Sequence, residues 1–416
     1  MKSLKRKFRK FKTVQPVFMA NFFRSNNVMK AIATIHNQHI FRQFNHLNRI
    51  LLLALSVIFW LPYSVILSVN LVKRNGKSIK IKAGKSGLIQ FFEQVYYANR
   101  WFIHPRHYYY FSLWRKEYCK KKELYFLEGN AQNLFNIINK NVDLQILDDK
   151  ILFHDFCKRN YLPAPEIVGI FEKGTFRNAT PNVLPESDIF FKLKSGYNTR
   201  GIERWDFIGN GMYHNVSSGQ FLVSAHLIDR YRKKSRRNTF FIQPRQHNHP
   251  RFDAISSPAL CTIRVITAID ENGMIQIFNP VLNVPVGIEI FNHMADGGIV
   301  VCIDAATGNL LTSYKFEAKG RPVPVNLIQK PGMQAITNIP EWEKVKEIAL
   351  EAHRLLAGIP VIGWDIAVTD TGPVILEGNH NIAMNFHQLP PNLPFGKTAF
   401  ARILLFHLRR SLEKAG

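Results

Sequence analysis

Apolar and polar residues alternate along several short stretches in the second half of the chain, and a period of two predicts β-strands. In the sequence IFFKLK, the apolar residues Ile189, Phe191 and Leu193 alternate with Lys192 and Lys194. We therefore expect one face of this strand to be apolar and the other to carry two ammonium groups. An exposed sheet edge that lysines protect from pairing with another chain is an alternative explanation.

Other stretches show the strand period or the helical period. Strands are expected in the segments 166–171, 240–243, 259–270 and 363–381. Asn272 and Gly273 predict a two-residue hairpin turn. Helices are expected at about 88–95, 149–158 and 341–357. Asp148 or Asp149 would cap the second helix, and Gly358 would end the third.

The segment 363–381, GWDIAVTDTGPVILEGNHN, reads as two strands joined by a tight turn, with one carboxylate on each strand. Gly372 suits the left-handed position of a three-residue loop formed by residues 370–372. This register places Asp365 directly opposite Glu377, and Asn379 on the same face. The other face would be apolar, with Trp364, Ile366 and Val368 on the first strand and Val374 and Leu376 on the second.

Two carboxylates that face each other across a hairpin repel, so the arrangement requires a cation. Mg²⁺ prefers oxygen ligands, binds few protein groups and takes its remaining ligands from phosphate and water. Asp365, Glu377 and Asn379 are therefore the predicted metal ligands. A surface hairpin whose carboxylates are merely solvated is the alternative.

Two further features point to an anionic ligand. The strand with Lys192 leads into a small polar loop, residues 195–201, which begins with Ser195 and Gly196 and ends at Gly201. Loop N–H groups and a lysine together suit a polyphosphate, although the GxxxxGK[ST] pattern of a P-loop is absent from the sequence. Arg264 lies within an apolar, β-branched strand, where a guanidinium group is unfavourable unless it meets an anion.

The positive charge of the chain is concentrated at its N-terminus. The formal net charge is +25, and the first 92 residues contain 17 Lys and Arg but no Asp or Glu. The sequence MKSLKRKFRKFK would place Leu4, Phe8 and Phe11 on one side of a helix surrounded by cations, as in helices that lie on anionic membranes. A disordered basic tail with affinity for nucleic acid is the alternative.

Residues 50–69 form an uncharged apolar run of 20 residues with Pro62 near its middle. This length is enough for one membrane-spanning helix, but cations lie on both sides and give no clear orientation. We expect a bent re-entrant hairpin or a shallow interfacial helix, because a single span with the rest of the chain in the cytosol would place the basic N-terminus outside. A helix buried within the protein is a further alternative.

The remaining histidine and cysteine residues do not predict a metal centre. Cys119, Cys157, Cys261 and Cys302 show no CxxC spacing, so buried free thiols in a reducing compartment are expected. The aromatic-rich sequence HPRHYYYF contains two histidines, which we interpret as surface or core residues rather than ligands.

Together these segments resemble the ATP-grasp superfamily from about Asp148 to the C-terminus. The resemblance matches Lys192 to the family lysine, residues 195–201 to the glycine loop, Gln243 to the hinge, and the Asp…Glu-x-Asn set to the metal site. The sequences GWDIAVTDTGPVILEGN, CTIRVIT, DGGIVVCIDAATG and HPRHYYYF are similar to the sugar-transfer-associated ATP-grasp family. Two residues depart from the family pattern: Leu193 stands where proline is frequent, and Gln243 where an acid is common.

The resemblance implies an α+β fold of two lobes that hold ATP between them, preceded here by a helical N-terminal region with the long apolar segment. It implies ATP contacts from Lys192, Lys194, Ser195, Gly196, Gly201 and Gln243, and Mg²⁺ ligands at Asp365, Glu377 and Asn379. It also implies catalytic roles for Arg264 and Lys192. The expected reaction joins a carboxylate to an amine through an acylphosphate.

The expected substrates are a small-molecule carboxylate and an amine, with an amino acid and a sugar acid or lipid-linked glycan of the cell envelope as the leading interpretation. The expected location is the cytoplasmic face of the membrane, and no specific nucleic acid is expected. A kinase that phosphorylates a hydroxyl group and an inactive basic adaptor are the alternatives. The expected organisation is a basic segment (1–85), an aromatic-rich helical lobe (86–145) and two ATP-grasp lobes (146–245 and 246–416).

Overall fold

The computed structural model of the protein contains two compact units. The structure describes residues 25–42, 46–178, 182–196, 201–253, 255, 259–285, 298–317, 321–325, 336–388 and 393–413. Unit 1 comprises Met1–Lys140, Gly320–Pro322 and Ala383–Gly416, and unit 2 comprises Asn141–Lys319 and Val323–Ile382. The predicted helix at Leu4, Phe8 and Phe11 lies outside the described residues.

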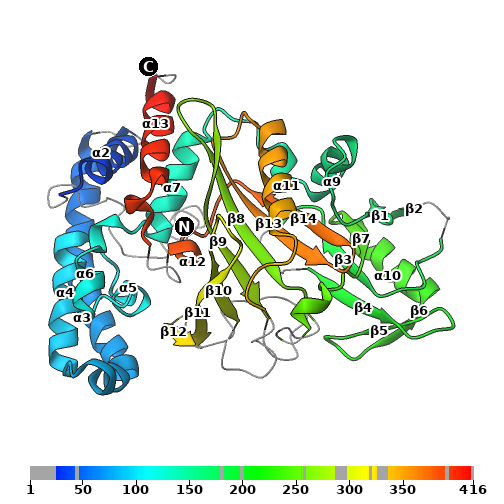
Figure 1. Cartoon of the computed structure of the whole chain (residues 1–416), viewed down its shortest axis with the longest axis horizontal. Coiled ribbons are helices and arrows are strands. Elements are labelled where there is room, and N and C mark those ends of the chain that lie inside the picture. The colour runs from blue at the N-terminus through cyan, green and yellow to red at the C-terminus, as the bar shows by residue number, and fades with distance from the viewer. Residues whose placement is uncertain are drawn as a thin grey trace. The chain divides into compact units, whose positions relative to one another are not determined.

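Unit 1 is helical, and helices from both ends of the sequence pack together in it (Figure 1). The C-terminal helix α13 contacts α2 and α7, and the ring of Phe126 packs edge-on against Phe400. The helices of this unit are α2 (Asn27–Arg42), α3 (His46–Ala83), α4 (Gly87–Trp101), α5 (Pro105–Tyr110), α6 (Lys116–Cys119), η1 (Lys122–Leu124), α7 (Glu128–Ile138), α12 (Asn385–Gln388), η6 (Phe395–Lys397) and α13 (Ala399–Glu413).

The apolar run lies in α3, and the re-entrant hairpin, one of the two expected arrangements, is wrong. Pro62 is inside one continuous helix of 38 residues. A proline removes one helical hydrogen bond, but the residues around it are fixed: Trp60 donates to the carbonyl of Ala98 at 2.9 Å, and Asn99 donates to Ser64 at 3.2 Å. Within the described part of the chain, no helix is long and apolar enough to cross a membrane.

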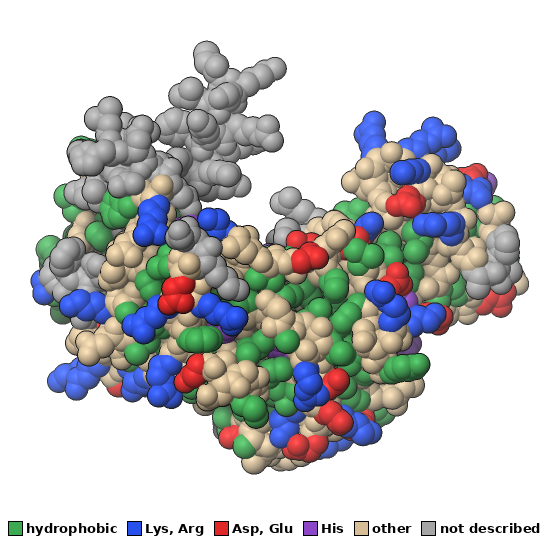
Figure 2. Space-filling view, turned by 90° about the horizontal axis from the view of Figure 1, so that it is seen from above, with side chains coloured by type: hydrophobic (Ala, Val, Ile, Leu, Met, Phe, Trp, Pro, Cys, Tyr) green, Lys and Arg blue, Asp and Glu red, His purple; other side chains and the backbone are tan. Residues whose placement is uncertain are grey.

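The second half of α3 and the whole of α4 form an antiparallel helical hairpin, joined at Gly84, Lys85 and Ser86. Its interior contains polar residues, since Gln90 and Gln94 are fully buried. Its outer surface contains exposed apolar residues. Figure 2 shows hydrophobic side chains interspersed with Lys and Arg on the face of the molecule that it presents.

His104 and His107 were expected to be surface or core residues rather than ligands. Both belong to the core of unit 1. His104 caps α5 by accepting a hydrogen bond from the N–H of Arg106. Burial lowers the pKa of His104 to about 4 and that of His107 to about 3, so both are neutral at physiological pH.

Unit 2 contains two seven-stranded sheets among its described residues, and all the strand pairs with an assigned register are antiparallel. The first sheet has the order β2-β1-β7-β3-β4-β5-β6. Its strands are β1 (Gly169–Glu172), β2 (Thr175–Asn178), β3 (Ile189–Leu193), β4 (Glu203–Phe207), β5 (Met212–Asn215), β6 (Phe221–Val223) and β7 (Phe240–Pro244). Helix α10 (Ser224–Ser235) covers one face, where Tyr231 stacks on Phe191 at 3.6 Å between ring centroids.

The second sheet has the order β12-β11-β10-β9-β8-β13-β14 (Figure 1). Its strands are β8 (Thr262–Ile269), β9 (Ile275–Val284), β10 (Ile299–Ile303), β11 (Leu310–Glu317), β12 (Arg321–Val325), β13 (Val361–Thr369) and β14 (Gly372–Asn379). Helices α8 (Gln145–Asp148), α9 (Lys150–Arg159), η2 (Pro250–Phe252) and α11 (Trp342–Leu355) complete the unit. The core joins this sheet to α9 and α11.

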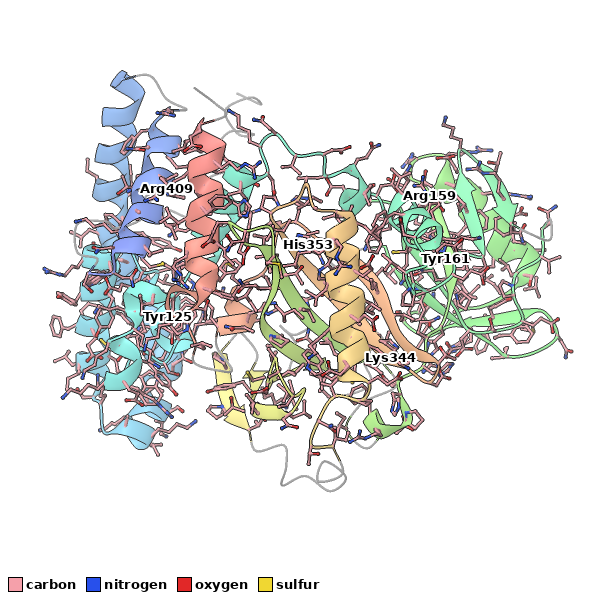
Figure 3. All side chains as sticks on the ribbon, turned by 45° about the horizontal axis from the view of Figure 1, so that its top comes forward. Tyr125, Arg159, Tyr161, Lys344, His353 and Arg409 are labelled. Atoms are coloured by element: carbon pink, nitrogen blue, oxygen red, sulfur yellow. The ribbon has the colours of Figure 1, made fainter. Side chains whose placement is uncertain are left out.

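Helix α11 is fixed to the sheet by the buried residue His353, which Figure 3 shows on this helix. The His353 ring bonds to the hydroxyl of Thr267 at 2.6 Å and to the carbonyl of Ile359 at 2.8 Å. The helix ends at Leu355, before the predicted stop at Gly358. Ile359, which the His353 ring contacts, therefore lies in the turn that follows the helix.

The predicted two-residue turn at Asn272 and Gly273 is also wrong. Strand β8 ends at Ile269 and β9 begins at Ile275, so the connection is longer. The carboxylate of Asp270 accepts hydrogen bonds from the N–H groups of Asn272 and Met274, both at 2.9 Å, and this wider loop replaces the tight turn.

Candidate functional site

Strands β13 and β14 place Asp365 directly opposite Glu377, as the sequence predicted, but through a different register. Thr369 pairs with Gly372, so the turn is one residue shorter than expected. A bulge between Asp365 and Ile366 then shifts the pairing by one residue and restores the predicted opposition. The shorter turn and the unexpected bulge each shift the register by one residue, and the two shifts cancel at Asp365 and Glu377.

The same bulge changes which residues of β14 reach the core. Val374 and Leu376 were expected on the apolar face, but Ile375 is the residue that joins Trp364, Ile366 and Val368 in the core. Ile375 lies opposite Ile366 before the bulge. Side chains alternate strictly between faces only while the pairing is regular, so the bulge ends the alternation before Glu377.

Cations lie on both sides of the carboxylate pair. Arg264 on β8 is paired with Asp365 by sheet register, and its guanidinium donates to the Asp365 carboxylate at 3.1 Å. Lys150, the first residue of α9, donates to Glu377 at 2.5 Å. Asn379 donates weakly to the other oxygen of Glu377, at 3.4 Å. The hairpin thus meets charge from another strand and from a helix.

The two carboxyl groups respond oppositely to these surroundings. For Asp365, burial and the nearby Glu377 carboxylate outweigh Arg264 and raise the pKa above its usual value. For Glu377, burial alone would raise the pKa, but the ammonium of Lys150 and the guanidinium of Arg264 hold it below its usual value. Glu377 is therefore the more firmly ionised of the pair.

Lys192 lies on β3 and its ammonium group donates to the side-chain oxygen of Gln243, on β7, at 2.7 Å. Gln243 in turn donates to the carbonyl of Pro165 at 2.9 Å. Burial, together with the charge of Lys150, lowers the pKa of Lys192 to about 8. In this structure Gln243 positions Lys192, and its predicted contact with a nucleotide stays a prediction.

Lys194, the residue after the lysine strand, links the first sheet to helix α9. Lys194 forms an ion pair with Asp149 at 2.9 Å, and its carbonyl accepts a hydrogen bond from the N–H of Lys150 at 3.0 Å. Asp149 also caps α9 by accepting from the N–H groups of Ile151 and Leu152. The predicted cap at Asp148 or Asp149 is thus Asp149.

The glycine loop is only partly described. Ser195 and Gly196 are exposed, and Gly201 has a positive φ of 78°. A Cβ at Gly201 would lie 2.6 Å from the side chain of Leu193, so only glycine fits there. Residues 197–200 lie outside the described residues, and the closing of this loop over a ligand stays a prediction.

Sequence reasoning missed Lys150, which stands between Lys192 and Glu377 in the charge network of this site. A signal for it was available. A lysine in the first turn of a helix opposes the helix dipole, which favours anions at that end. Such a placement indicates that the ammonium group interacts with something outside the helix.

The donor set of the candidate metal site is two carboxylates and one amide. No cluster of three or more His, Cys, Asp or Glu residues that would hold a metal ion occurs within the described ranges. Two carboxylates and an amide oxygen nevertheless fit Mg²⁺, which takes several ligands from phosphate and water. The Nε atom of Arg264 is buried and has no hydrogen-bond partner among the described residues, which fits an absent anionic ligand.

Beside this group, His380 bonds to the carboxylate of Asp148 at 3.0 Å. His380 follows Asn379 directly, and Asp148 precedes the cap of α9. This contact joins the end of β14 to the start of α9, so it helps to hold Lys150 near Glu377.

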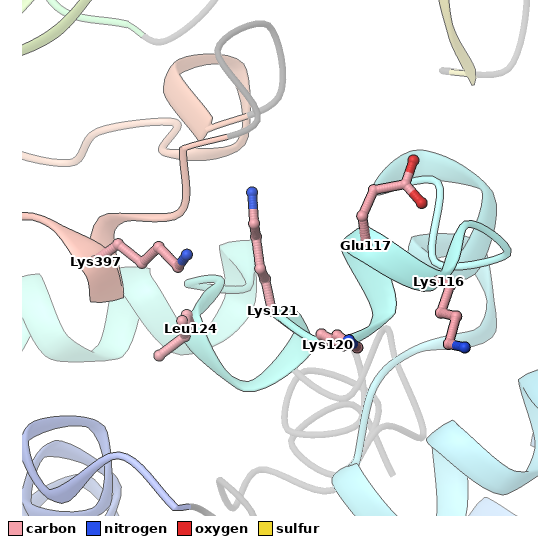
Figure 4. A pocket seen from close by; sticks show the side chains of 6 residues that line it. All are labelled: Lys116, Glu117, Lys120, Lys121, Leu124 and Lys397. Carbon is pink, nitrogen blue, oxygen red and sulfur yellow. The ribbon is translucent and has the colours of Figure 1, made fainter.

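A shallow pocket of about 460 Å³ lies in unit 1, separate from these residues (Figure 4). It is lined by Lys116, Glu117, Lys120, Lys121, Leu124 and Lys397. With one carboxylate among four lysines, it carries positive charge but contains none of the predicted site residues.

A family model described as sugar-transfer associated ATP-grasp matches residues 130–396. The structure is similar to a D-alanyl-alanine synthetase A from Vibrio cholerae (11% identity, 64% of this chain and 66% of that chain, TM-score 0.38). It is also similar to a D-alanine–D-alanine ligase from Bacillus anthracis complexed with ATP (11%, 65% and 69%, 0.36). A third is an L-amino acid ligase from Bacillus licheniformis (9%, 63% and 48%, 0.35), of which this chain spans about half the length. A search of curated proteins found no match.

Proposed function

The chain belongs to the sugar-transfer associated ATP-grasp family, and from this premise we propose that it is an ATP- and Mg²⁺-dependent carboxylate–amine ligase. One observation carries the proposal: Lys192, Lys150 and Arg264 gather around the opposed carboxylates of Asp365 and Glu377. Three cations from two sheets and a helix, beside two carboxylates, form a site that suits a metal–polyphosphate complex better than a purely structural ion pair.

The cations would bind and orient the phosphates of ATP. Lys192 and Lys150 would contact phosphate oxygens, with Lys150 leaving Glu377 as the ligand arrives. Ser195, Gly196 and Gly201 would contribute loop N–H groups or the backbone freedom to close over the nucleotide. Exclusion of water by this loop would protect a reactive intermediate from hydrolysis.

Asp365, Glu377 and Asn379 would hold Mg²⁺. When bound, Mg²⁺ would supply positive charge that neutralises phosphate oxygens of ATP. Displacement of Lys150 from Glu377 frees the carboxylate oxygen that a metal ion needs. Asp365 would stay oriented by Arg264 through the 3.1 Å contact.

The proposed reaction has two steps. A substrate carboxylate oxygen bonds to the γ-phosphorus of ATP, and ADP leaves with the electron pair of the broken P–O bond. An amine nitrogen then bonds to the acyl carbon, phosphate leaves with the electron pair of the C–O bond, and the amine loses a proton to solvent. Arg264 would stabilise the negative charge that develops on the acyl group through its unpartnered Nε–H.

The family description suggests a sugar-related substrate. We propose that an amino acid or another amine is joined to a sugar acid in the synthesis of a surface polysaccharide or cell-envelope glycan. A lipid-linked glycan would bring the acceptor to the cytoplasmic face of the membrane, where ATP is available. The basic N-terminal part of the chain suits that location, because it carries 17 positive charges and no acidic residue before Glu93.

The test is Mg²⁺-dependent release of ADP and phosphate by the full chain. Pools of amines are supplied with and without uronic acids and related sugar acids, and Lys192→Ala serves as the inactive control. The proposal expects release that requires both a carboxylate and an amine and that disappears in the variant. Hydroxamate formation when hydroxylamine replaces the amine would detect the acylphosphate directly.

Two outcomes would favour the alternatives. ADP formation without an amine, together with a phosphorylated product, would identify a kinase. Absence of ATP binding, combined with salt-sensitive binding of a polyanion that survives the Lys192→Ala and Glu377→Gln substitutions, would identify a basic adaptor.

A further inference from the structure

The hairpin of α3 and α4 exposes an apolar stripe on a described surface. On α4, the exposed fractions are 70% for Leu88, 61% for Phe92 and 52% for Tyr96. These residues are spaced by four positions, so they lie along one side of the helix. Apolar residues this exposed and this regular are unusual for a surface that faces only water.

Helix α3 also exposes apolar residues. Ile58 is 62% exposed, Phe59 56%, Leu61 51% and Ile66 63%. Val69 is the last exposed apolar residue of this group before the helix becomes cationic. Because α3 and α4 run antiparallel, Ile66 and Val69 lie at about the level of Tyr96 and Phe92 along the hairpin, as the contact of Ser64 with Asn99 indicates.

Buried hydrogen bonds inside the hairpin set the rotation of α4 and so keep its apolar stripe on the outside. Gln90 donates to the carbonyls of Gly76 and Lys85, at 3.0 and 2.8 Å, and accepts from the hydroxyl of Tyr109 at 2.8 Å. Rotation of α4 that turned Phe92 inward would break these buried hydrogen bonds. The exposed stripe is therefore built into the packing of the helix.

The charge beside the stripe identifies its partner. After Val69 most of the exposed positions of α3 are cations, namely Lys73, Arg74, Lys77, Lys80 and Lys82, although Ile81 is exposed among them. The first acidic residue of the chain, Glu93, is already paired with Lys85 and accepts a hydrogen bond from Tyr108 at 2.5 Å. An apolar, partly aromatic stripe next to cations that have no ion pair among the described residues complements an anionic lipid surface.

We propose that the outer face of the α3–α4 hairpin is a docking surface for an anionic lipid bilayer, on which the two helices lie in the plane of the membrane. The apolar side chains insert among the acyl chains, and the cations contact the lipid phosphates. This proposal rests on the proposed function only for its purpose, which is to hold the enzyme near a lipid-linked acceptor.

The test measures co-sedimentation of the full chain with vesicles of neutral phosphatidylcholine, with and without anionic phosphatidylglycerol. No ATP or substrate is present, so the result is independent of ligase activity. We expect binding that requires the anionic lipid and weakens with salt. The variant Ile66→Ser/Leu88→Ser/Phe92→Ser should bind at least about tenfold more weakly, because it removes three insertable apolar side chains.

The matched control removes three exposed apolar residues from unit 2. Ile208, Phe221 and Met274 are 52%, 56% and 65% exposed, and the variant Ile208→Ser/Phe221→Ser/Met274→Ser should bind vesicles as the parent chain does. Circular dichroism checks that both variants are folded. Equal vesicle binding by the parent and the α3–α4 variant would overturn the proposal.

Two other occupants of the face would also overturn it. If the parent chain does not bind vesicles and the α3–α4 substitutions convert a dimer to a monomer, the face contacts a second copy. If removal of residues 1–24 creates vesicle binding that the full chain lacks, that segment covers the face. In both cases the ADP-release assay still reports separately on the proposed ligase.

Discussion

Two hairpins in this molecule reverse the usual distribution of side chains, in which polar groups are exposed and apolar groups are buried. The β13–β14 hairpin carries two opposed carboxylates, of which Asp365 is only 13% exposed and Glu377 33%. The α3–α4 hairpin does the reverse: it buries Gln90 and Gln94 completely and exposes Leu88 and Phe92. Each arrangement is unfavourable for an isolated hairpin.

The difference between them lies in how each is compensated. The carboxylates of the β-hairpin are compensated within the described structure, by Arg264 and Lys150. The exposed apolar stripe of the helical hairpin has no described part of the chain packed over it. Carboxylates balanced by basic side chains suit a site where a ligand can take the place of one of these ion pairs, whereas an exposed apolar stripe suits a surface that a membrane covers.

The largest effect is expected from Glu377→Gln, which removes one charge from the β-hairpin. We expect ADP release to fall by roughly a hundred- to a thousandfold, because a charged metal ligand is lost. The fold should persist, since the amide keeps the shape of the side chain. Asp370→Asn, at the exposed turn of the same hairpin, is the control that should keep full activity. Near-normal turnover of Glu377→Gln would contradict the metal assignment.

A somewhat smaller effect is expected from Lys150→Met, which keeps most of the side-chain volume but removes the cation. Affinity for ATP should fall by about ten- to a hundredfold, as expected for the loss of a charged hydrogen bond to a buried phosphate. Isothermal titration calorimetry with a non-hydrolysable ATP analogue measures this affinity. Lys158→Met, on the exposed surface of the same helix, is the matched control, and equal affinities of the two variants would remove Lys150 from the site.

The helical hairpin gives the third prediction, through an exchange of residue types on one helix. Gln90→Leu should destabilise the protein by about 2 kcal/mol, because it removes the buried hydrogen bonds that Gln90 makes with the Tyr109 hydroxyl and the Gly76 carbonyl. Leu88→Gln should change the free energy of unfolding by less than about 0.5 kcal/mol, because Leu88 is exposed. Urea denaturation compares them, and equal effects would mean that the interior is not selectively polar.

The smallest effect is expected from pH. The pKa of Lys192 is lowered to about 8, so its ammonium group is lost as the pH rises through that value. If only the protonated form binds ATP well, the dissociation constant should rise by at most about tenfold from pH 7 to pH 9. Bound phosphate favours the charged form, so ATP should also shift the midpoint to higher pH.

The same group has the opposite effect on stability. The unfolded chain holds its Lys192 proton up to about the usual pKa, whereas the folded chain loses it near 8. Between these values the unfolded state binds more protons, so the Lys192 contribution to the free energy of unfolding rises with pH. Lys192→Met should remove both dependences, and persistence of the ATP-binding midpoint in this variant would assign the titration to another group.

Much of unit 2 could be predicted from short patterns. The strand with Ile189, Phe191 and Lys192, the capped helix at Asp149 and the opposition of Asp365 to Glu377 are all local consequences of period and turn chemistry. The turn itself was predicted one residue too long, because the bulge that shifts the register depends on pairing with the neighbouring strand and leaves no clear mark in the sequence.

Lys150 and Gln243 show the limit of such patterns. The ion pair of Lys150 with Glu377 joins residues 227 positions apart, and Gln243 holds Lys192 across 51 positions. Neither partner can be identified from spacing, because the distance between them is set by the packing of α9 and two sheets. The single continuous helix at Pro62 likewise depends on contacts with α4.

The sequence by itself determined the types of element, the family resemblance, the carboxylate pair and the concentration of positive charge at the N-terminus, because these follow from residue types and short-range periods. Only the tertiary structure decided which cations meet the carboxylates, and which side of the apolar run faces outward. The physical reason is the same in both cases: burial and charge pairing depend on neighbours that are distant along the chain, and the local pattern does not specify them.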